Sequence, residues 1–259
     1  MKQTIDLTLL QVALAYIFVI IVLIIVRARG IKREKEIVIS SVRMTLQLML
    51  VGYLLVYLFE NPNALITAAI LVLMEAFAIF TVFNRFKKSL TAPLKWVIAT
   101  SMSIGTVLCI VYFLVVVIRI SPWYDPQYFI PISGMIIGNS MTGISLGVKT
   151  LLDGMGQQKA AVEEALILGA TPQDASKTVV NSAFDAAILP TVNSMVGMGI
   201  VFLPGMMTGQ ILSGTLPTTA IAYQIAIMLG ILGAVALTVI IMLGWGYRTF
   251  FNKQVQLSR

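Results

Sequence analysis

The sequence contains no histidine and only one cysteine, Cys109, among its 259 residues. A single cysteine excludes an intramolecular disulfide, and the lack of histidine and cysteine leaves no donor set for a tight tetrahedral metal site. Charge is scarce as well, because only 11% of the residues are charged, whereas soluble domains carry roughly 25%. A GxxxxGK[ST] phosphate loop, a His-Glu zinc motif and a paired-aspartate motif are all missing, which argues against ATP hydrolysis or intramembrane proteolysis by this chain.

The chain is instead rich in long apolar runs. Hydrophobic residues make up 58% of it and the mean hydropathy is +0.94. A helix needs about 20 apolar residues to cross a bilayer. We therefore predict an all-α, polytopic membrane protein with one transmembrane domain over residues 1–259. Its seven predicted transmembrane helices are 9–26, 37–59, 64–83, 97–118, 129–148, 183–203 and 220–245. The connection 204–217 is uncharged, and whether it re-enters the membrane is left open.

The net charge of +7 indicates membrane orientation rather than nucleic-acid binding. If the amino terminus is outside, every lysine and arginine except Lys2 and Arg119 falls on the cytoplasmic side. This asymmetry follows the positive-inside rule. We predict a multi-pass protein of the cell (plasma) membrane, with the amino terminus outside and the carboxyl terminus in the cytoplasm.

The longest polar stretch, residues 161–190, carries the signals of two helices that meet at a corner. Gly169 follows an apolar and acidic helical run and suits the left-handed conformation that ends a helix. Thr171 suits the N-cap of the next helix, Pro172 its first position and Asp174 its first turn. We predict a short helix, a glycine corner and a capped helix, within a cytoplasmic segment of about 149–180 between spans five and six.

Polar side chains inside the spans are functional candidates, because burying them in hydrocarbon is costly. Arg43 and Gln47 share one face of span two, where Arg43 either reaches lipid phosphates or serves function. Glu75 in span three binds a cation, pairs with Arg43 or sits protonated in the bundle. Asn139 and Asn193 either offer amide oxygens to a metal or bond across helices, and Asp185 is a further polar candidate inside the spans.

Methionine is abundant, with 14 residues, and many of them lie in the later spans. Thioethers suit soft metals such as copper(I), whereas carboxylate and amide oxygens suit harder divalent ions. Methionine is also an adaptable filler of helical cores. Besides Glu75 and Asn139, the candidate metal ligands are Met135, Met141, Met206 and Met207.

Span five contains two pairs of glycines four residues apart, at 134 and 138 and at 143 and 147. Such spacing lets helix backbones approach closely. The approach occurs either within the bundle of one chain or at the seam between two copies.

The polar stretch resembles the coupling loop of ABC transporter permeases, whose pattern is Glu-Ala-Ala, three residues and then Gly. Glu163, Glu164, Ala165 and Gly169 occupy this pattern, with Glu164 at the first alanine position. Other stretches resemble the bacterial iron-export ABC permease family, which includes plant aluminium-tolerance permeases. They lie at about residues 40–228 and comprise Arg43, Gln47, Leu48, Gly52 and Tyr53, then IPI at 130–132 with GM at 134–135, GN at 138–139 and Met141, then LPGMMTGQIL at 203–212 with Pro217, and AIAYQI at 220–225.

The resemblance implies the membrane permease subunit of an ABC transporter that exports iron or a related metal. ATP and magnesium then belong to a separate ATPase subunit, and this chain is expected to hold no cofactor. Two permeases are expected to pair as a homodimer around a path through the bilayer. Glu163 and Glu164 are expected to face the ATPase, while Val162, Ala165 and Leu166 seat the helix in its groove.

Other functions remain open at this point. The coupling loop resembles that of importers, so an importer-type ABC permease for another small solute is one alternative. An intramembrane enzyme and a non-transporting receptor or assembly factor are others. If a stand-alone ATPase subunit were encoded beside this chain, that observation would favour the permease.

Overall fold

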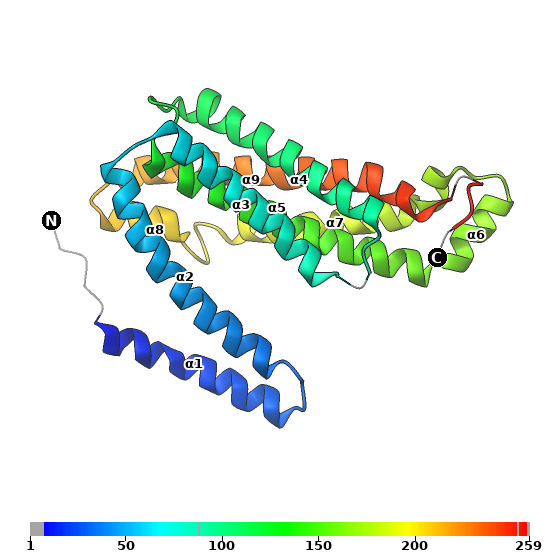
Figure 1. Cartoon of the computed structure of the whole chain (residues 1–259), viewed down its shortest axis with the longest axis horizontal. Helices are drawn as coiled ribbons and strands as arrows, with labels where there is room; N and C mark the ends of the chain where they lie inside the picture. The colour runs from blue at the N-terminus through cyan, green and yellow to red at the C-terminus, as the bar shows by residue number, and fades with distance from the viewer. Residues whose placement is uncertain (1–7, 88, 253, 258–259) are drawn as a thin grey trace. The chain divides into compact units, whose positions relative to one another are not determined.

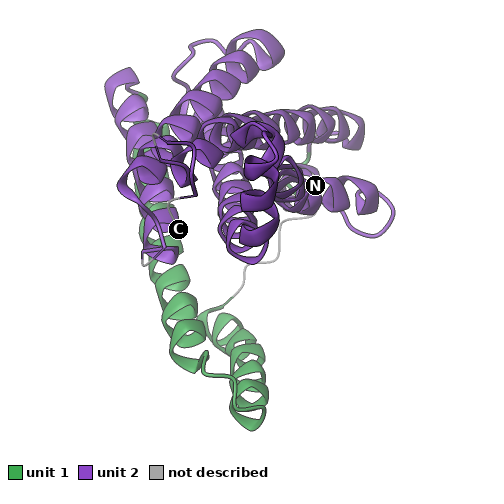
Figure 2. Cartoon of the chain, turned by 90° about the vertical axis from the view of Figure 1, so that its right-hand side faces the viewer, with its two compact units in different colours: residues 1–62, 212–214 green, residues 63–211, 215–259 purple. Residues whose placement is uncertain are grey.

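The computed structural model describes residues 8–87, 89–252 and 254–257. Over these residues the chain is built from helices, with isolated bridges but no extended strand, which confirms the predicted all-α class. Figure 2 distinguishes two compact units, residues 1–62 with 212–214 and residues 63–211 with 215–259. Four basic residues that contribute to the predicted charge asymmetry lie outside the described residues: Lys2, Lys88, Lys253 and Arg259.

The first unit is a helical hairpin. Helix α1 spans Leu9–Ala28 and α2 spans Glu34–Glu60, close to the predicted spans 9–26 and 37–59. Thr8 opens α1 with a capping box, in which the backbone amide of Thr8 donates to the side chain of Gln11 at 2.8 Å. The hydroxyl of Tyr16 on α1 donates to the carbonyl oxygen of Ser41 on α2 at 3.4 Å. A polar contact therefore links the two helices.

The second unit contains the remaining helices (Figure 1). In chain order they are α3 (Ala64–Arg85), α4 (Ala92–Tyr112), the π-helical turn η1 (Phe113–Ile118), α5 (Pro126–Gln157), α6 (Lys159–Ile167), α7 (Pro172–Gly197), α8 (Gly205–Leu212), α9 (Pro217–Gly246) and the 3₁₀ turn η2 (Tyr247–Phe250).

Helix α5 is at the centre of this unit and packs against α3, α4, α7 and α9. Its approach to α9 depends on glycine. A Cβ at Gly143 would lie 2.7 Å from Val235 Cγ1, and one at Gly147 would lie 3.1 Å from Met242 Cε, whereas Gly138 has nothing within 4 Å. The pair at 143 and 147 therefore packs within the chain, and the face at Gly138 is open.

Helix α5 is also much longer than the predicted span 129–148. Its 32 residues correspond to about 48 Å, against a hydrocarbon core of about 30 Å. The extra turns follow Val148 and lead directly to α6. A continuous helix thus connects the apolar bundle with the polar corner.

In the described part of the chain, six helices are long and apolar enough to cross a membrane: α1, α2, α3, α4 with η1, α5, and α9 with η2. This supports a multi-pass membrane protein. Helix α7 is not among them, and it carries charged residues such as Asp174, Lys177 and Asp185. It also ends at Gly197, inside the predicted span 183–203, and α8 lies in the predicted connection 204–217. The seventh span stays a prediction.

Candidate functional site

The polar stretch forms the predicted corner between α6 and α7. Gly169 has a φ of +92°, a left-handed conformation that penalises any residue with a Cβ. The hydroxyl oxygen of Thr171 accepts from the amide of Asp174 at 3.2 Å, and the hydroxyl lies 2.6 Å from a carboxylate oxygen of the same residue. Pro172 is the first residue of α7. The local geometry is confirmed, and the coupling role of the corner stays a prediction.

Helix α6 exposes an acidic and an apolar surface. Glu164 is exposed, and Glu163 forms a surface ion pair with Lys159 at 3.7 Å. At the end of the helix, Ile167 and Leu168 are 85% and 81% exposed. Large apolar side chains that stay exposed next to a carboxylate are typical of an interaction surface.

The structure corrects the predicted contact face of α6. Val162 is only 2% exposed, so the prediction that it contacts a partner is wrong. Ala165 and Leu166 are half-buried, and Leu166 lines a groove of about 560 Å³ between α6 and residues 254–257. The sequence could not distinguish these faces, because apolar residues occur on both sides of so short a helix. Ile167 and Leu168 were missed for that reason.

The second feature is the interruption between α7 and α8, drawn in yellow in Figure 1. The chain turns at Gly199, whose φ is +83°. The Gly199 amide donates to the carbonyl oxygen of Phe202 at 3.0 Å, and the Val201 amide donates to that of Gly197 at 2.9 Å. At membrane depth, irregular backbone is tolerated only where it is buried in protein or lines a cavity.

A cavity of about 240 Å³ lies at this interruption. Its walls come from α5, the end of α7, the irregular stretch, α8 and α9. Four methionine sulfurs belong to its lining, from Met135, Met198, Met206 and Met228. Oxygen and nitrogen come from Asn139, Thr191, Ser194 and Gln224. The cavity can therefore offer neutral thioether, amide and hydroxyl donors.

Gln224 on α9 is the most constrained polar group of the cavity. It is 7% exposed. Its amide nitrogen donates to the sulfur of Met198 at 3.8 Å, and its Oε1 has no hydrogen-bond partner among the described residues. A buried amide oxygen without a partner is destabilising. Asn139, in contrast, is exposed and donates to the carbonyl oxygen of Met135 at 2.7 Å.

The cavity unites only part of the predicted metal set. Met135, Asn139 and Met206 line it, whereas Met141, Met207 and Glu75 are not among its lining residues. Sequence reasoning did not select Gln224, Thr191, Ser194, Met198 and Met228. Gln224 had a usable signal, because it is a polar side chain inside the predicted span 220–245.

Glu75 lies between α3 and α4. The hydroxyl of Thr106 is 3.0 Å from Glu75 Oε2 and 2.7 Å from the carbonyl oxygen of Met102. One hydroxyl proton cannot serve both acceptors. Both contacts are satisfied when the carboxyl group is protonated and donates to Thr106, which then donates to Met102. The geometry favours the protonated packing role among the three predicted for Glu75.

The other predicted polar residues lie on exposed faces. Arg43 and Gln47 are exposed on α2. Asp185 and Asn193 are exposed on α7 and are eight residues apart, so both lie on one face of that helix. None of the four lines the methionine-rich cavity.

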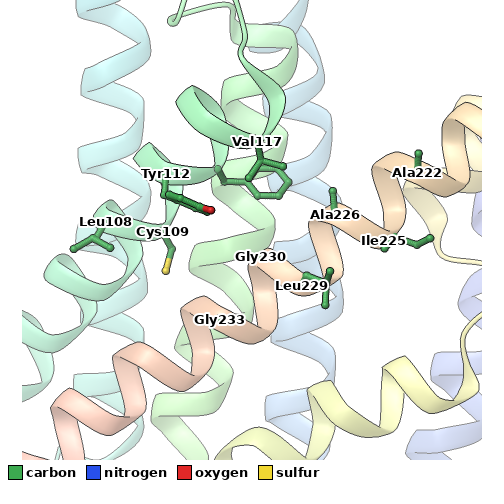
Figure 3. A pocket seen from close by; sticks show the side chains of 11 residues that line it. Leu108, Cys109, Tyr112, Val117, Ala222, Ile225, Ala226, Leu229, Gly230 and Gly233 are labelled. Carbon is green, nitrogen blue, oxygen red and sulfur yellow. The ribbon is translucent and has the colours of Figure 1, made fainter.

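A second cavity, of about 650 Å³, lies between α4 with η1 and α9 (Figure 3). Apart from Cys109 and Tyr112 its lining is apolar, and on the α9 side it includes Ala226, Gly230 and Gly233. Cys109 is half-buried here. With so few donors this cavity offers no ion-binding site.

The chain also contains the letters of a GxSxG motif at 143–147. Ser145 is 5% exposed and lies inside α5. A nucleophile elbow requires a sharp turn from a strand to a helix. The match is therefore a packing segment and not a catalytic one. No cluster of three or more His, Cys, Asp and Glu side chains is found over the described residues either.

Residues 9–251 match the profile of the uncharacterised protein family UPF0014. The chain belongs to the UPF0014 family. The Escherichia coli relative, named probable iron export permease protein FetB, is 34% identical over 95% of this chain and 93% of its own length. Protein ALUMINUM SENSITIVE 3 of Arabidopsis thaliana is 33% identical over 95% and 88%. The UPF0014 membrane protein slr1647 of Synechocystis is 36% identical over 88% of both chains.

No solved structure is significantly similar to the chain. The resemblance to the iron-export permease family is confirmed by the family match and by these relatives. The chain is thus a membrane permease of the UPF0014 family.

Proposed function

We propose that this chain is the membrane subunit of an ABC transporter that exports metal ions, iron among them, with ATP hydrolysis on a separate subunit. The observation that carries the proposal is the corner at Gly169, where a short exposed acidic helix is rigidly connected to the transmembrane bundle. The name of the Escherichia coli relative supports export of iron.

Helix α6 supplies the surface for the ATPase. Glu164 has no ion-pair partner among the described residues, and Ile167 and Leu168 are exposed beside it. The corner connects this surface to α7, and the long helix α5 leads into it from the other side. Movement of the ATPase is thereby passed to two helices that both border the methionine-rich cavity.

The exposed polar residues support a homodimer around a central path. Polar residues in membrane helices rarely face lipid. Asn139 on α5 and Asp185 and Asn193 on α7 are exposed in the single chain, and the open face at Gly138 lies on α5 as well. In this proposal a second permease covers these faces and leaves a polar path between the copies.

Co-purification tests the proposal. The tagged full chain is co-expressed with a stand-alone ABC ATPase subunit from the same organism, and ATPase retained on the permease is measured. We expect Glu163→Ala with Glu164→Ala to reduce the retained ATPase at least fivefold and to abolish the rise in cellular iron tolerance that the wild-type pair confers. The physical reason is loss of two carboxylates at the docking surface.

The matched control is Glu34→Ala with Glu36→Ala, which removes the same charge from the first turn of α2. It should leave retention and iron tolerance at wild-type levels. Wild-type behaviour of the α6 double variant would show that the corner is an ordinary loop and would end the proposal.

A further inference from the structure

The four methionines of the cavity come from four different elements. Met135 belongs to α5, Met198 follows the end of α7, Met206 is in the first turn of α8 and Met228 is in α9. Thioethers from four separate elements thus line one cavity. The convergence points to a shared ligand for thioether sulfur.

The second, independent observation is the oxygen of Gln224. This side chain is 7% exposed, lines the cavity and leaves Oε1 without a partner in the described part of the chain. Its amide nitrogen holds Met198, which fixes the position of the oxygen. A cation bound in the cavity supplies the missing partner for Oε1.

The site carries no formal charge. Among the described residues, no acidic or basic side chain lines the cavity. The carboxyl end of α7 contributes a partial negative charge and the amino end of α8 a partial positive one, so the helix ends nearly cancel. In the irregular stretch, the amides of Gly199, Val201 and Phe202 donate to carbonyl oxygens between Gly197 and Phe202. The side-chain donors that line the cavity are all neutral.

Neutral donors select the cation by softness and charge. A hard divalent ion gives up a strong hydration shell and needs carboxylates to offset that cost, whereas a soft monovalent ion has thioethers among its preferred ligands. The volume of about 240 Å³ holds about eight waters at about 30 Å³ each. An ion can enter partly hydrated and exchange water for sulfur.

We propose that this cavity is a binding site for a soft monovalent cation of the copper(I) and silver(I) class, held by the methionine sulfurs and by Gln224 Oε1. The inference rests on the proposed function and adds a cargo class to it. Binding through neutral ligands is weak enough for release, which a transport site requires.

The test measures silver(I) binding to the purified full chain in detergent by isothermal titration calorimetry. All variants carry Cys109→Ala, because a thiol binds silver tightly and Cys109 lines the other cavity. We expect saturable binding of one silver ion per chain. Met206→Leu, Met198→Leu and Gln224→Leu should each weaken it at least tenfold, and manganese(II) should bind at least a hundredfold more weakly.

Matched controls come from two of the methionines that do not line the cavity. Met207→Leu lies one residue from Met206, and Met141→Leu lies on the same helix as Met135. Methionine to leucine conserves volume, so all the methionine variants should fold, and their melting temperatures verify this. The two controls should bind silver within twofold of the Cys109→Ala parent.

The outcomes separate this inference from the proposed function. Absent silver binding, or equal weakening by cavity and control variants, overturns the silver and copper site. So does manganese binding as tight as that of silver. If the same preparation still retains the ATPase and confers iron tolerance, only the cargo inference fails. If silver binds as expected but no ATPase is retained, the site stands and the ABC assignment fails.

Discussion

The amide of Gln224 on α9 donates to the sulfur of Met198, 3.8 Å away at the end of α7. This bond joins a regular transmembrane helix to the irregular stretch that separates α7 from α8. Movement of α7 relative to α9 therefore changes the cavity directly. Helix α7 begins at the Gly169 corner and ends next to Met198. One helix therefore connects the proposed docking surface on α6 with the candidate cargo site.

Gly169→Val should uncouple the proposed docking surface on α6 from the methionine-rich cavity. The φ of +92° disfavours a Cβ, by roughly 1 kcal/mol for alanine and more for valine. No atom lies within 4 Å of that Cβ position, so the cost is conformational and the spans should still insert. We expect normal membrane levels with substrate-dependent ATP hydrolysis reduced at least fivefold. The control is Gly156→Ala in α5, where an added Cβ also meets nothing within 4 Å. With this permease variant, ATP hydrolysis by the complex should be normal.

The contact face of α6 can be tested with two kinds of variant. Ile167→Ala with Leu168→Ala should reduce ATPase retention and leave the melting temperature unchanged, because both side chains are exposed. Val162→Ala should leave ATPase retention unchanged. It should lower the free energy of unfolding by about 2 kcal/mol, because Val162 is buried. If Val162→Ala instead lost ATPase retention while keeping wild-type stability, the original prediction that Val162 contacts the ATPase would be supported.

The close contact between α4 and α9 predicts a stability effect. A Cβ at Gly105 would lie 2.4 Å from Thr238 Cγ2 and 3.0 Å from its Cα. Backbone cannot yield cheaply, so Gly105→Ala should destabilise by about 1–3 kcal/mol. Gly233→Ala meets nothing within 4 Å and should be neutral or stabilising by up to about 1 kcal/mol. Thermal unfolding in detergent compares the two variants. Equal melting temperatures would contradict the close packing of α4 against α9 at Gly105.

Glu75→Gln should preserve function. A glutamine amide can donate to Thr106 as the protonated carboxyl group does, and Glu75 does not line the cavity. We expect iron tolerance within twofold of wild type and a stability change below about 1 kcal/mol. Loss of transport with a normal melting temperature would instead show that the carboxylate charge is needed on the path.

Cysteine labelling examines the orientation. In a Cys109→Ala background, single cysteines at Asn61, Lys87 and Gln158 should react with an impermeant maleimide from outside, inside and inside, respectively. Asn61 and Gln158 are exposed at helix ends, so accessibility is not limiting. Labelling of Gln158 from outside would contradict both the topology and the docking role of α6.

The sequence determined the features that depend on local chemistry. Apolar length placed α1, α2, α3 and α9 within a few residues, because hydrophobic burial in a bilayer needs little else. The Gly169 corner was readable for the same reason, since capping and positive φ are properties of adjacent residues. The resemblance to the iron-export family followed from residues that can be read in order along the chain.

Only the tertiary structure decided which distant side chains meet. It turned Val162 inward, placed Glu75 beside Thr106, and brought Met135, Met198 and Gln224 to one cavity while leaving Met207 outside. Helical periodicity gives each residue a face but not the neighbour that covers it, because packing against other helices fixes that. The interruption at Gly199 was equally hidden. An apolar stretch of sequence has the same hydropathy whether it continues as a helix or turns to border a cavity.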